Sequence, residues 1–497
     1  MQQNTPVVRS KGRVPIVARI VSFLAGLFVT FNAYAQDELI GDLASFWDIP
    51  LGIHALELNP LLFAEYACGT DGGPPSILIA DWSEYASCRT EEGTGLHEVQ
   101  FRYDDEPEFI ARARSLHHLL ATYEGVKLFT FPAIISALFD DDGFLIGLRA
   151  VTDPRVSDDE RLRSISLGGF LIGRFGADAW TCEPLPGVEG ETGIGDRFQK
   201  DRCVQSTDEL DLVLETYFLR KPGQFGINPR TNIAEEGLFE SRVRFEMFLN
   251  TAIEDRDERL ALLQASERPA SEAELNRDIA LNCPGCDLSG INLKRQDLTG
   301  ANLAGANLVG ANLHGAILIQ ANLEGADLSE ANLNRANIRQ ARMSGAVVND
   351  AMLYAAVLDA ADLSSADLTG SRMQEARMTR VNLDGARAGA VDFSRARMLS
   401  ISANGTYFGG SWFHDAQLTR GELLNADFTW AIMQGTVLTN ADLSGAVFNT
   451  ADLILADLRG ATLTGTDFTD ARLTQAKLAN TNREDALLDN AFDAPPP

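Results

Sequence analysis

The chain has little of what enzyme active sites and nucleic-acid-binding surfaces are usually made from. Its 497 residues include only 6 His, and they contain no G-x-S-x-G, H-E-x-x-H or Walker-type phosphate-loop motif. Basic residues are also scarce, with 42 Lys and Arg against 70 Asp and Glu, which gives a formal net charge of −28. Such a surface repels nucleic acid and anionic lipid and favours cationic partners. We therefore expect no catalytic residue, no metal ligand, no cofactor and no nucleic-acid partner.

Long apolar runs are missing after residue 35. The first 35 residues carry the run 20–31, followed by Ala33-Tyr34-Ala35. Four basic residues precede the run: Arg9, Lys11, Arg13 and Arg19. This arrangement is typical of a cleavable secretory signal, and a run of this length is too short to span a bilayer. An uncleaved anchor is the alternative. Cleavage would take the formal net charge from −28 to −32 and would leave a periplasmic protein without a membrane span.

The chain has only six cysteines, all after the predicted signal. This number and position indicate disulfides formed in an oxidising compartment. Pairing near neighbours in sequence is the simplest of the fifteen connectivities. The expected pairs are Cys68 with Cys88 and Cys182 with Cys203, and Cys283 and Cys286 form a C-x-x-C motif. A redox or metal role for this motif is the alternative, but no second C-x-x-C and no nearby His accompany it. We expect a structural role, and whether these two cysteines are bonded stays open.

From Leu288 to Leu478 one apolar side chain recurs at every fifth residue. Of these 39 centre positions 37 are Leu, Ile, Val, Met or Phe, and only Ala388 and Ala403 are smaller. A small residue, most often Ala, lies two positions before most centres. A period of five fits neither an α-helix nor a β-strand, so each five-residue unit must turn the chain.

Units such as Ala326-Asp327-Leu328 and Ala441-Asp442-Leu443 match the signature A-(D/N)-L-x-x, and residues 283–483 resemble the pentapeptide-repeat family. The resemblance implies a right-handed quadrilateral β-helix in which four pentapeptides make one coil. The centre and the small residue then face inward, while Asn or Asp and Gly occupy tight turns. We expect a helical linker and N-terminal cap at 251–282, and a closing helical turn followed by a Pro tail at 484–497.

Residues 36–250 lack the five-residue period and predict an α+β domain with an antiparallel sheet. The expected strands are 98–103, 134–139, 144–148, 212–219 and 242–249. Helices are expected at 108–122 and 157–175, the second opened by a capping box of Ser157 and Glu160.

No group in this domain forms a recognisable catalytic or metal constellation. Asp140 to Asp142 could belong to a calcium loop, but the D-x-D-x-D-G spacing is missing, so we expect a hairpin turn ending at Gly143. The histidines of the domain are either isolated or, in one adjacent pair, directed to different sides of a helix: His54, His97, His117 and His118.

Two sets of outward-facing residues in the repeats are candidate contact surfaces. Tyr407, Trp412, Trp430 and Ile432 form an apolar patch on an otherwise polar surface, which indicates either a partner or a cover from the N-terminal domain or the tail. A candidate basic patch comprises Arg372, Arg377, Arg387 and Arg397, for which salt bridges on a solvated surface are the alternative.

Three classes of function follow. We favour an exported, non-catalytic scaffold or interaction protein of the cell envelope, with an unidentified protein partner or with self-association. An enzyme or ligand-binding activity in the N-terminal domain, with the repeats as a targeting arm, is the second. The third comes from the family resemblance alone, because some pentapeptide-repeat proteins are acidic DNA mimics that protect topoisomerases. The predicted export argues against it, since topoisomerases are cytoplasmic.

Overall fold

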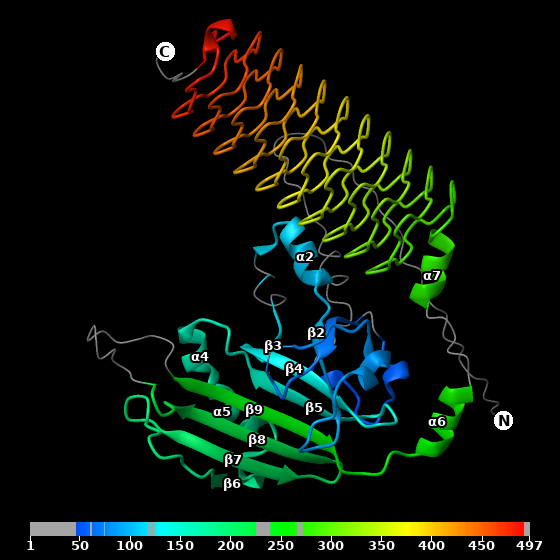
Figure 1. Cartoon of the computed structure of the whole chain (residues 1–497), viewed down its shortest axis with the longest axis vertical. Coiled ribbons are helices and arrows are strands. Elements are labelled where there is room, and N and C mark those ends of the chain that lie inside the picture. Colours follow the sequence, from blue (N-terminus) through cyan, green and yellow to red (C-terminus); the bar gives the residue numbers. More distant parts are fainter. Residues whose placement is uncertain are drawn as a thin grey trace, which may run out of the picture. The chain divides into compact units, whose positions relative to one another are not determined.

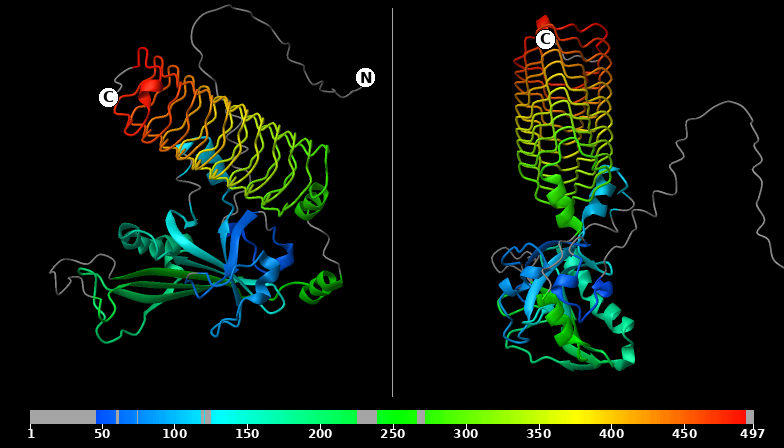
Figure 2. Two further views of the ribbon diagram at one scale, coloured as in Figure 1. Left: turned by 45° about the horizontal axis from the view of Figure 1, so that its top comes forward. Right: turned by 90° about the vertical axis from the view of Figure 1, so that its right-hand side faces the viewer.

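The computed structural model describes residues 46–59, 62–73, 75–117, 120, 125–224, 239–265 and 272–491. The predicted signal segment, His118 and the Pro tail lie outside these residues. Figures 1 and 2 show a β-sheet domain followed in the chain by a solenoid. In the described part of the chain, no helix combines the length and the hydropathy that crossing a bilayer needs.

The first domain is built on one nine-stranded sheet with the strand order β1-β2-β4-β5-β9-β8-β7-β6, and β3 pairs with β4. Neighbouring strands are antiparallel. The strands are β1 Phe63–Cys68, β2 His97–Tyr103, β3 Lys127–Leu128, β4 Phe131–Phe139, β5 Leu145–Thr152, β6 Thr181–Pro184, β7 Gln199–Ser206, β8 Leu210–Leu219 and β9 Glu240–Leu249. All five predicted strands are present. The four others, β1, β3, β6 and β7, were not predicted.

The described helices of this region are few and short: α2 Glu106–Ala113, α4 Asp158–Ser164, α5 Ser166–Arg174 and α6 Arg256–Ala265. One-turn 3-10 helices are η1 Phe46–Asp48, η2 Ala55–Glu57, η4 Trp82–Ser87 and η5 Ala177–Ala179. The capping box of Ser157 and Glu160 is confirmed. The predicted helix 108–122 is interrupted, since α2 ends at Ala113 and Ser115 adopts a left-handed φ of 56°, while residues 117 and 120 are again helical. The domain is thus mainly antiparallel β rather than evenly mixed.

The hairpin between β4 and β5 is confirmed, and its acidic residues have structural partners. Asp140 accepts hydrogen bonds from the backbone N–H of Phe144 at 2.9 Å and of Asp142 at 3.1 Å, and Gly143 has a φ of +88°. Arg256 of α6 contacts Asp140 at 2.7 Å and Asp142 at 2.8 Å. The turn is therefore closed by its own side chain and neutralised by an arginine.

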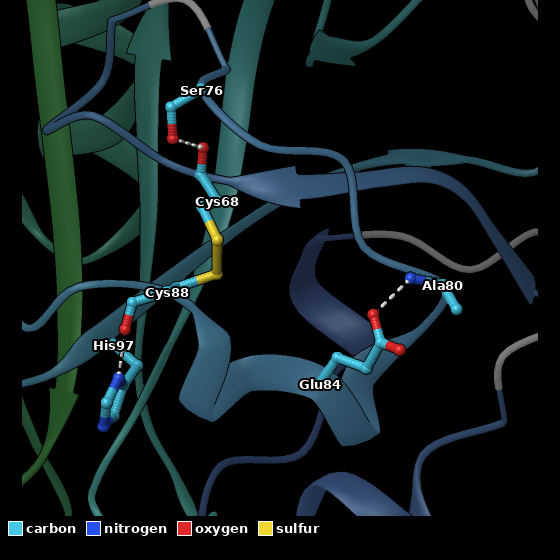
Figure 3. Close-up of a disulfide and its surroundings, with 6 residues drawn as sticks. All are labelled: Cys68, Ser76, Ala80, Glu84, Cys88 and His97. Atoms are coloured by element: carbon cyan, nitrogen blue, oxygen red, sulfur yellow. Dashed lines mark hydrogen bonds between the residues drawn. A yellow bond between two sulfur atoms is a disulfide. The ribbon is translucent and has the colours of Figure 1, made fainter.

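Three disulfides are present, and they confirm the expected near-neighbour pairing. Cys68 bonds Cys88, Cys182 bonds Cys203, and Cys283 bonds Cys286. Figure 3 shows the first of them, where the carbonyl oxygen of Cys88 lies 2.6 Å from a ring nitrogen of His97.

In the solenoid, residues twenty apart pair as parallel β-bridges, from Asn282 with Asn302 to Asp467 with Leu487. Each coil therefore contains four pentapeptides. The fifth residue of each unit is left-handed, with φ between 52° and 74°, which explains the many glycines there. Asp or Asn before the centre caps this turn, as where Asp327 Oδ1 accepts the backbone N–H of Ser329 at 3.0 Å.

The centres and the small residues fill the solenoid core. Leu303, Leu323, Leu363 and Leu443 are fully buried, as are the two small centres Ala388 and Ala403. Where Ser or Thr replaces Ala, its hydroxyl group usually finds a carbonyl, as Ser411 Oγ does with Ala388 at 2.5 Å. Phe408, Phe428, Phe448 and Phe468 stack in one column with ring centroids 4.8–5.0 Å apart.

The two ends of the solenoid differ. At the N-terminal end, helix α7 Glu272–Ala280 places the fully buried Ala280 in the solenoid core, as expected of a cap. At the C-terminal end the predicted helical segment 484–492 is wrong. Only Arg483–Asp485 is helical, as the 3-10 helix η6, and Leu487 resumes the bridge pattern by pairing with Asp467. The 3-10 helix thus replaces the regular turn of one unit without an insertion, and the coil continues in the same phase beyond it.

Candidate functional site

One face of the solenoid binds helix α2 of the first domain. It follows a row of bridge residues spaced by twenty: Asn292, Asn312, Asn332, Met352, Arg372, Asp392, Trp412, Ile432, Asp452 and Arg472. We call this row, with the turns on either side of it, the docking face. Its inner half ends at Asp392 and its outer half begins at Trp412. The contacts of helix α2 described below all lie on the inner half.

The start of α2 is held by charges. The carboxylate of Asp105 lies 2.5 Å from Arg295 and 3.0 Å from His314 Nε2, and it also pairs with Arg335. Asp105 is 7% exposed and His314 is 1% exposed. Burial alone would raise the pKa of the Asp105 carboxyl group, but the hydrogen bond from His314 and the charges of His314, Arg295 and Arg335 hold this pKa well below its usual range. Asp105 therefore stays ionised while it is docked.

Neighbouring acidic residues complete this anchor. Asp104 lies 2.8 Å from Arg295 and pairs with Lys294, and Lys294 Nζ lies 2.8 Å from Glu106. Glu106 also accepts the side-chain amides of Asn312 and Asn332 at 2.8 and 2.9 Å. A buried ion pair is stabilising only when its remaining lone pairs and protons also have hydrogen-bond partners. In this cluster, most of the charged atoms have such partners.

The same cluster superficially resembles a metal site. Ligand atoms of Asp104, Asp105 and His314 all lie within 4.8 Å of one another. The carboxylate oxygens of Asp104 and Asp105, however, already accept hydrogen bonds from Arg295. The ammonium group of Lys294 adds a further positive charge beside them. A metal cation would have to displace these protein cations, so the arrangement fits an ion-pair anchor better than a metal centre.

The middle of α2 is held by apolar and aromatic contacts. Phe109 lies with its ring centroid 5.9 Å from that of Tyr354, and Ala113 packs with Met352 and Tyr354 in one buried cluster. At the end of the helix, Gln374 donates its side-chain amide to the carbonyl oxygen of Ala113 at 3.2 Å. An eight-residue helix is marginal on its own, so α2 depends on these contacts.

Sequence reasoning missed this contact, although it left a signal. Lys294, His314, Tyr354 and Gln374 occupy turn positions of one row, where most pentapeptides carry small or short polar residues. Large residues spaced by twenty or forty at such positions indicate that something covers the row. The partner segment, residues 104–113, carries no comparable pattern of its own.

The predicted apolar patch lies on and beside the outer half of the docking face. Trp412 and Ile432 belong to the row itself and are 42% and 37% exposed. Trp430 is 70% exposed at the turn before Ile432, and Leu455, which was not predicted, is 52% exposed at the turn after Asp452. Among the described residues, the predicted cover from the N-terminal domain or the tail does not bury them.

Tyr407 lies on the neighbouring row and reaches over the turn toward the docking face. A Cβ atom on Gly409 would lie 2.3 Å from the Tyr407 hydroxyl, and one on Gly389 would lie 2.9 Å from its ring. These two glycines therefore leave the space in which the Tyr407 ring rests. The ring remains 49% exposed.

The four predicted arginines do not share one surface. Arg377 and Arg397 are neighbours in one row, Arg372 belongs to the docking face, and Arg387 lies next to Tyr407 in a third row. Arg377 pairs with Asp359 at 2.5 Å. The structure therefore separates the candidate basic patch into three rows.

In the sheet domain the most strongly charged cluster surrounds a fully buried arginine. Arg149 on β5 donates to Glu246 at 2.7 Å and to Glu91 at 2.9 Å, and it lies 3.2 Å from Glu98. Burial would lower the pKa of Arg149, but these carboxylates raise it, so the guanidinium stays charged. Glu98 in turn accepts the backbone N–H of Asp71 at 2.6 Å. The cluster fastens the loops around Asp71 and Glu91 to the sheet.

The histidines of this domain have structural partners. His54 caps η2 and contacts the carbonyl oxygen of Asp142 at 2.9 Å, while His97 lies between Cys88 and Asp141. The structure brings neither beside a nucleophile. His117 lies beyond the end of α2 and is helical again after the break at Ser115.

Comparison with known proteins identifies only the repeats. The family described as pentapeptide repeats matches eight copies, in segments between residues 282 and 470. No curated protein matches the chain.

Solved structures match the same region. HetL, a pentapeptide repeat protein involved in heterocyst differentiation regulation from the cyanobacterium Nostoc sp. strain PCC 7120, is 27% identical, with 43% of this chain and 93% of that chain covered and a TM-score of 0.25. A pentapeptide repeat protein from the Arabidopsis thaliana thylakoid lumen is 35% identical, with 20% and 68% covered and a TM-score of 0.15. QnrB1, a plasmid-mediated fluoroquinolone resistance protein, is 18% identical, with 42% and 92% covered and a TM-score of 0.18.

Proposed function

Because the chain belongs to the pentapeptide-repeat family through residues 282–470, we propose that it is an exported, non-catalytic interaction protein of the cell envelope. Pentapeptide-repeat proteins are generally non-catalytic and commonly mediate protein interactions. In this proposal the solenoid is the right-handed quadrilateral form of the family, and its docking face receives other proteins. The sheet domain supplies α2 and positions it on that face.

The observation that carries the proposal is the docked helix itself. The inner half of the face binds α2 through an ion-pair anchor at Asp105, a ring contact at Phe109 and a hydrogen bond at Ala113. These are elements of a protein interface: apolar and aromatic contacts beside a buried, hydrogen-bonded group of charges. The outer half offers more exposed apolar surface than the inner half and has no described segment upon it.

Export is supported by the cysteines together with the N-terminal pattern. All six cysteines are paired, which is the usual state in an oxidising compartment and a rare one in the cytosol. The basic residues before the run 20–31 and the Ala-x-Ala pattern that follows it are those of a secretory signal.

Ligand binding in the sheet domain is the second candidate function. A cavity of about 920 Å³ lies beside the Cys68–Cys88 disulfide and is lined by Asp71, Glu91 and Arg244, among others. A ligand of matching size has room there. Glu91 and Asp71 are, however, already paired with Arg149 and Arg244, which favours a structural role for these charges. A DNA-mimic role in protecting a topoisomerase remains the third candidate and rests on the family resemblance together with the acidic charge.

Site-specific photo-crosslinking in living cells tests the proposal. A photoreactive amino acid is placed at position 412 on the docking face, and at position 442 on another row as the matched control. We expect an adduct with an envelope protein from position 412 and none from position 442. Intact mass of the purified chain measures signal cleavage and disulfide content. Equal adducts from both positions, or an uncleaved chain with free thiols in the cytoplasm, would contradict the proposal.

A further inference from the structure

The outer half of the docking face continues an interface that the molecule already uses. Helix α2 runs along the face from the coil of Arg295 to that of Gln374, and the Gln374 side chain also donates to Asp392 at 2.8 Å. The next residue of the row is Trp412. The exposed aromatic surface therefore begins where the contacts of α2 end.

The backbone of this face offers no free edge. The N–H of Trp412 donates to the carbonyl oxygen of Val391 at 2.9 Å, and its own carbonyl oxygen accepts from Phe393 at 2.7 Å. Ile432 is bonded in the same way on both sides, to Ser411 and Phe413. An extended peptide could not add to the sheet here, since strand addition needs unpaired backbone groups. A partner must bind through side chains, as α2 does, and an amphipathic helix is the form that presents them.

The charge of the face reverses along its length. In the inner half, Lys294, Arg295 and Arg335 receive the acidic start of α2. The outer half of the face and its turns carry three acidic residues, Asp415, Asp452 and Asp470, and one basic residue, Arg472. Arg472 is already paired with Asp452 at 2.9 Å. The other acidic residues of this part of the solenoid lie on the other rows.

This charge selects among the occupants of the face. A second copy of the chain would bring two acidic surfaces together, and an anionic membrane would be repelled in the same way. A basic segment would be attracted, and its apolar side chains would cover the indole rings of Trp412 and Trp430. Aromatic side chains in such a position are frequent interface anchors, and the cations of Lys and Arg also bind to indole faces.

We propose that the outer half of the docking face binds a basic amphipathic helix of a partner protein, one that carries Lys or Arg together with an apolar stripe. This rests on the proposed function and names the chemistry of its partner. Trp412, Trp430, Ile432 and Leu455 receive the apolar stripe. Asp415 and Asp470, at the turns on either side of the row, attract the basic residues.

A displayed library of helical peptides tests this chemistry without knowledge of the natural partner. The oxidised chain without residues 1–35 is the bait, and its Trp412→Ala, Trp430→Ala variant is used for counter-selection. We expect the enriched peptides to be positively charged, with apolar residues at helical spacing. Enrichment of acidic or uncharged peptides would overturn the proposal, and so would a failure to enrich any peptide.

The affinity of one enriched peptide for variants then locates its site. The double Trp variant should bind it at least tenfold more weakly, and Asp415→Asn and Asp470→Asn should each weaken it about two- to fivefold at low salt, the range of an exposed ion pair. Leu262→Ala is the matched control, because Leu262 is 63% exposed on α6, away from the solenoid rows, and its loss should have no effect. Melting curves of all variants verify that they fold.

Three results would identify a different occupant or none. If the double Trp variant bound the enriched peptide as tightly as the wild type does, the outer half of the docking face would not be the binding site. Sedimentation showing a wild-type dimer that this variant dissociates would assign the face to a second copy of the chain. Binding to phosphatidylglycerol vesicles that requires the two Trp residues would assign it to a lipid surface. In each of these cases, an envelope protein crosslinked at position 412 would still support the proposed function. If basic peptides were selected but no envelope protein were crosslinked at position 412, the proposed function alone would be contradicted.

Discussion

Replacing Asp105 by Asn tests whether the ion-pair anchor holds α2 on the solenoid. The substitution keeps the shape of the side chain but leaves His314, Arg295 and Arg335 facing a neutral group. Removing one member of a buried ion pair costs about 3 to 5 kcal/mol. The lower end applies, because Asp104 still pairs with Arg295 and because the Arg335 side chain is 40% exposed and can be hydrated. A loss of about 3 kcal/mol corresponds to about 150-fold in the docking equilibrium.

Hydrogen exchange of the α2 amides measures this equilibrium directly. Since α2 is too short to persist undocked, its amides exchange whenever it leaves the face. We expect residues 106–113 to exchange about a hundredfold faster in the variant, with the solenoid core unchanged. Glu324→Gln is the matched control, because Glu324 pairs with Arg342 at the surface and its loss should cost less than about 1 kcal/mol. Unchanged protection of α2 in the Asp105→Asn chain would refute the anchor.

The pH dependence has a definite sign. The docked pKa of Asp105 is held below the value of about 3.9 for a free carboxyl group, so its contribution is complete above that pH and is lost as the pH falls further. The difference in α2 protection between wild type and Asp105→Asn should therefore be constant from about pH 5 to 7 and narrow below about pH 4. If the difference in α2 protection between the two chains were the same at pH 2.5 and pH 7, ionisation of Asp105 would not contribute to the docking of α2.

Three further predictions concern stability. Leu363→Asp should lower the free energy of unfolding by well over 3 kcal/mol, because Leu363 is fully buried in a dry core, and unchanged denaturant unfolding would contradict the inward assignment of the centres. Ala403→Leu should cost about 1 to 3 kcal/mol by overpacking, since Ile401 beside it is also buried, whereas a higher melting temperature would reveal unfilled space. Cys182→Ser with Cys203→Ser should cost about 3 kcal/mol by the chain-entropy estimate for a loop of roughly 20 residues, and non-reducing peptide mapping of the wild type should recover the Cys182–Cys203 peptide pair.

Much of the solenoid could be predicted because its determinants are local and repeated. A centre such as Leu303 and the Ala two positions before it are buried in every coil by the same five-residue geometry. Because the unit is repeated, each pentapeptide confirms which positions of the other pentapeptides face inward. The two small centres, Ala388 and Ala403, therefore did not change the assignment of inward positions. The prediction failed at the C-terminal end, where only η6 at Arg483–Asp485 is helical and Leu487 resumes the bridge pattern in the same phase.

The sheet domain was predicted less completely. Strands β4 and β5 are apolar and buried along most of their length, β8 and the first half of β9 alternate between buried and partly exposed residues, and the turn at Gly143 has a clear signal. Strand β6 is fully exposed, so it has no apolar alternation to detect, and its place at the edge is set by pairing with β7 and by the Cys182–Cys203 bond. The break in the predicted helix 108–122 was missed because helix propensity continues where the chain turns at Ser115.

The sequence by itself determined which residues of the repeats face outward. A period of five with four units to a coil places Trp412 and Ile432 on one row without any knowledge of tertiary contacts, since each coil repeats the geometry of the one before. Only the tertiary structure decided that α2 occupies the same row. The contacts between residues 104–113 and the solenoid join positions 190 to 261 apart in the chain. No local pattern encodes so distant a pairing, because it depends on the shape and charge of two surfaces that exist only after each has folded.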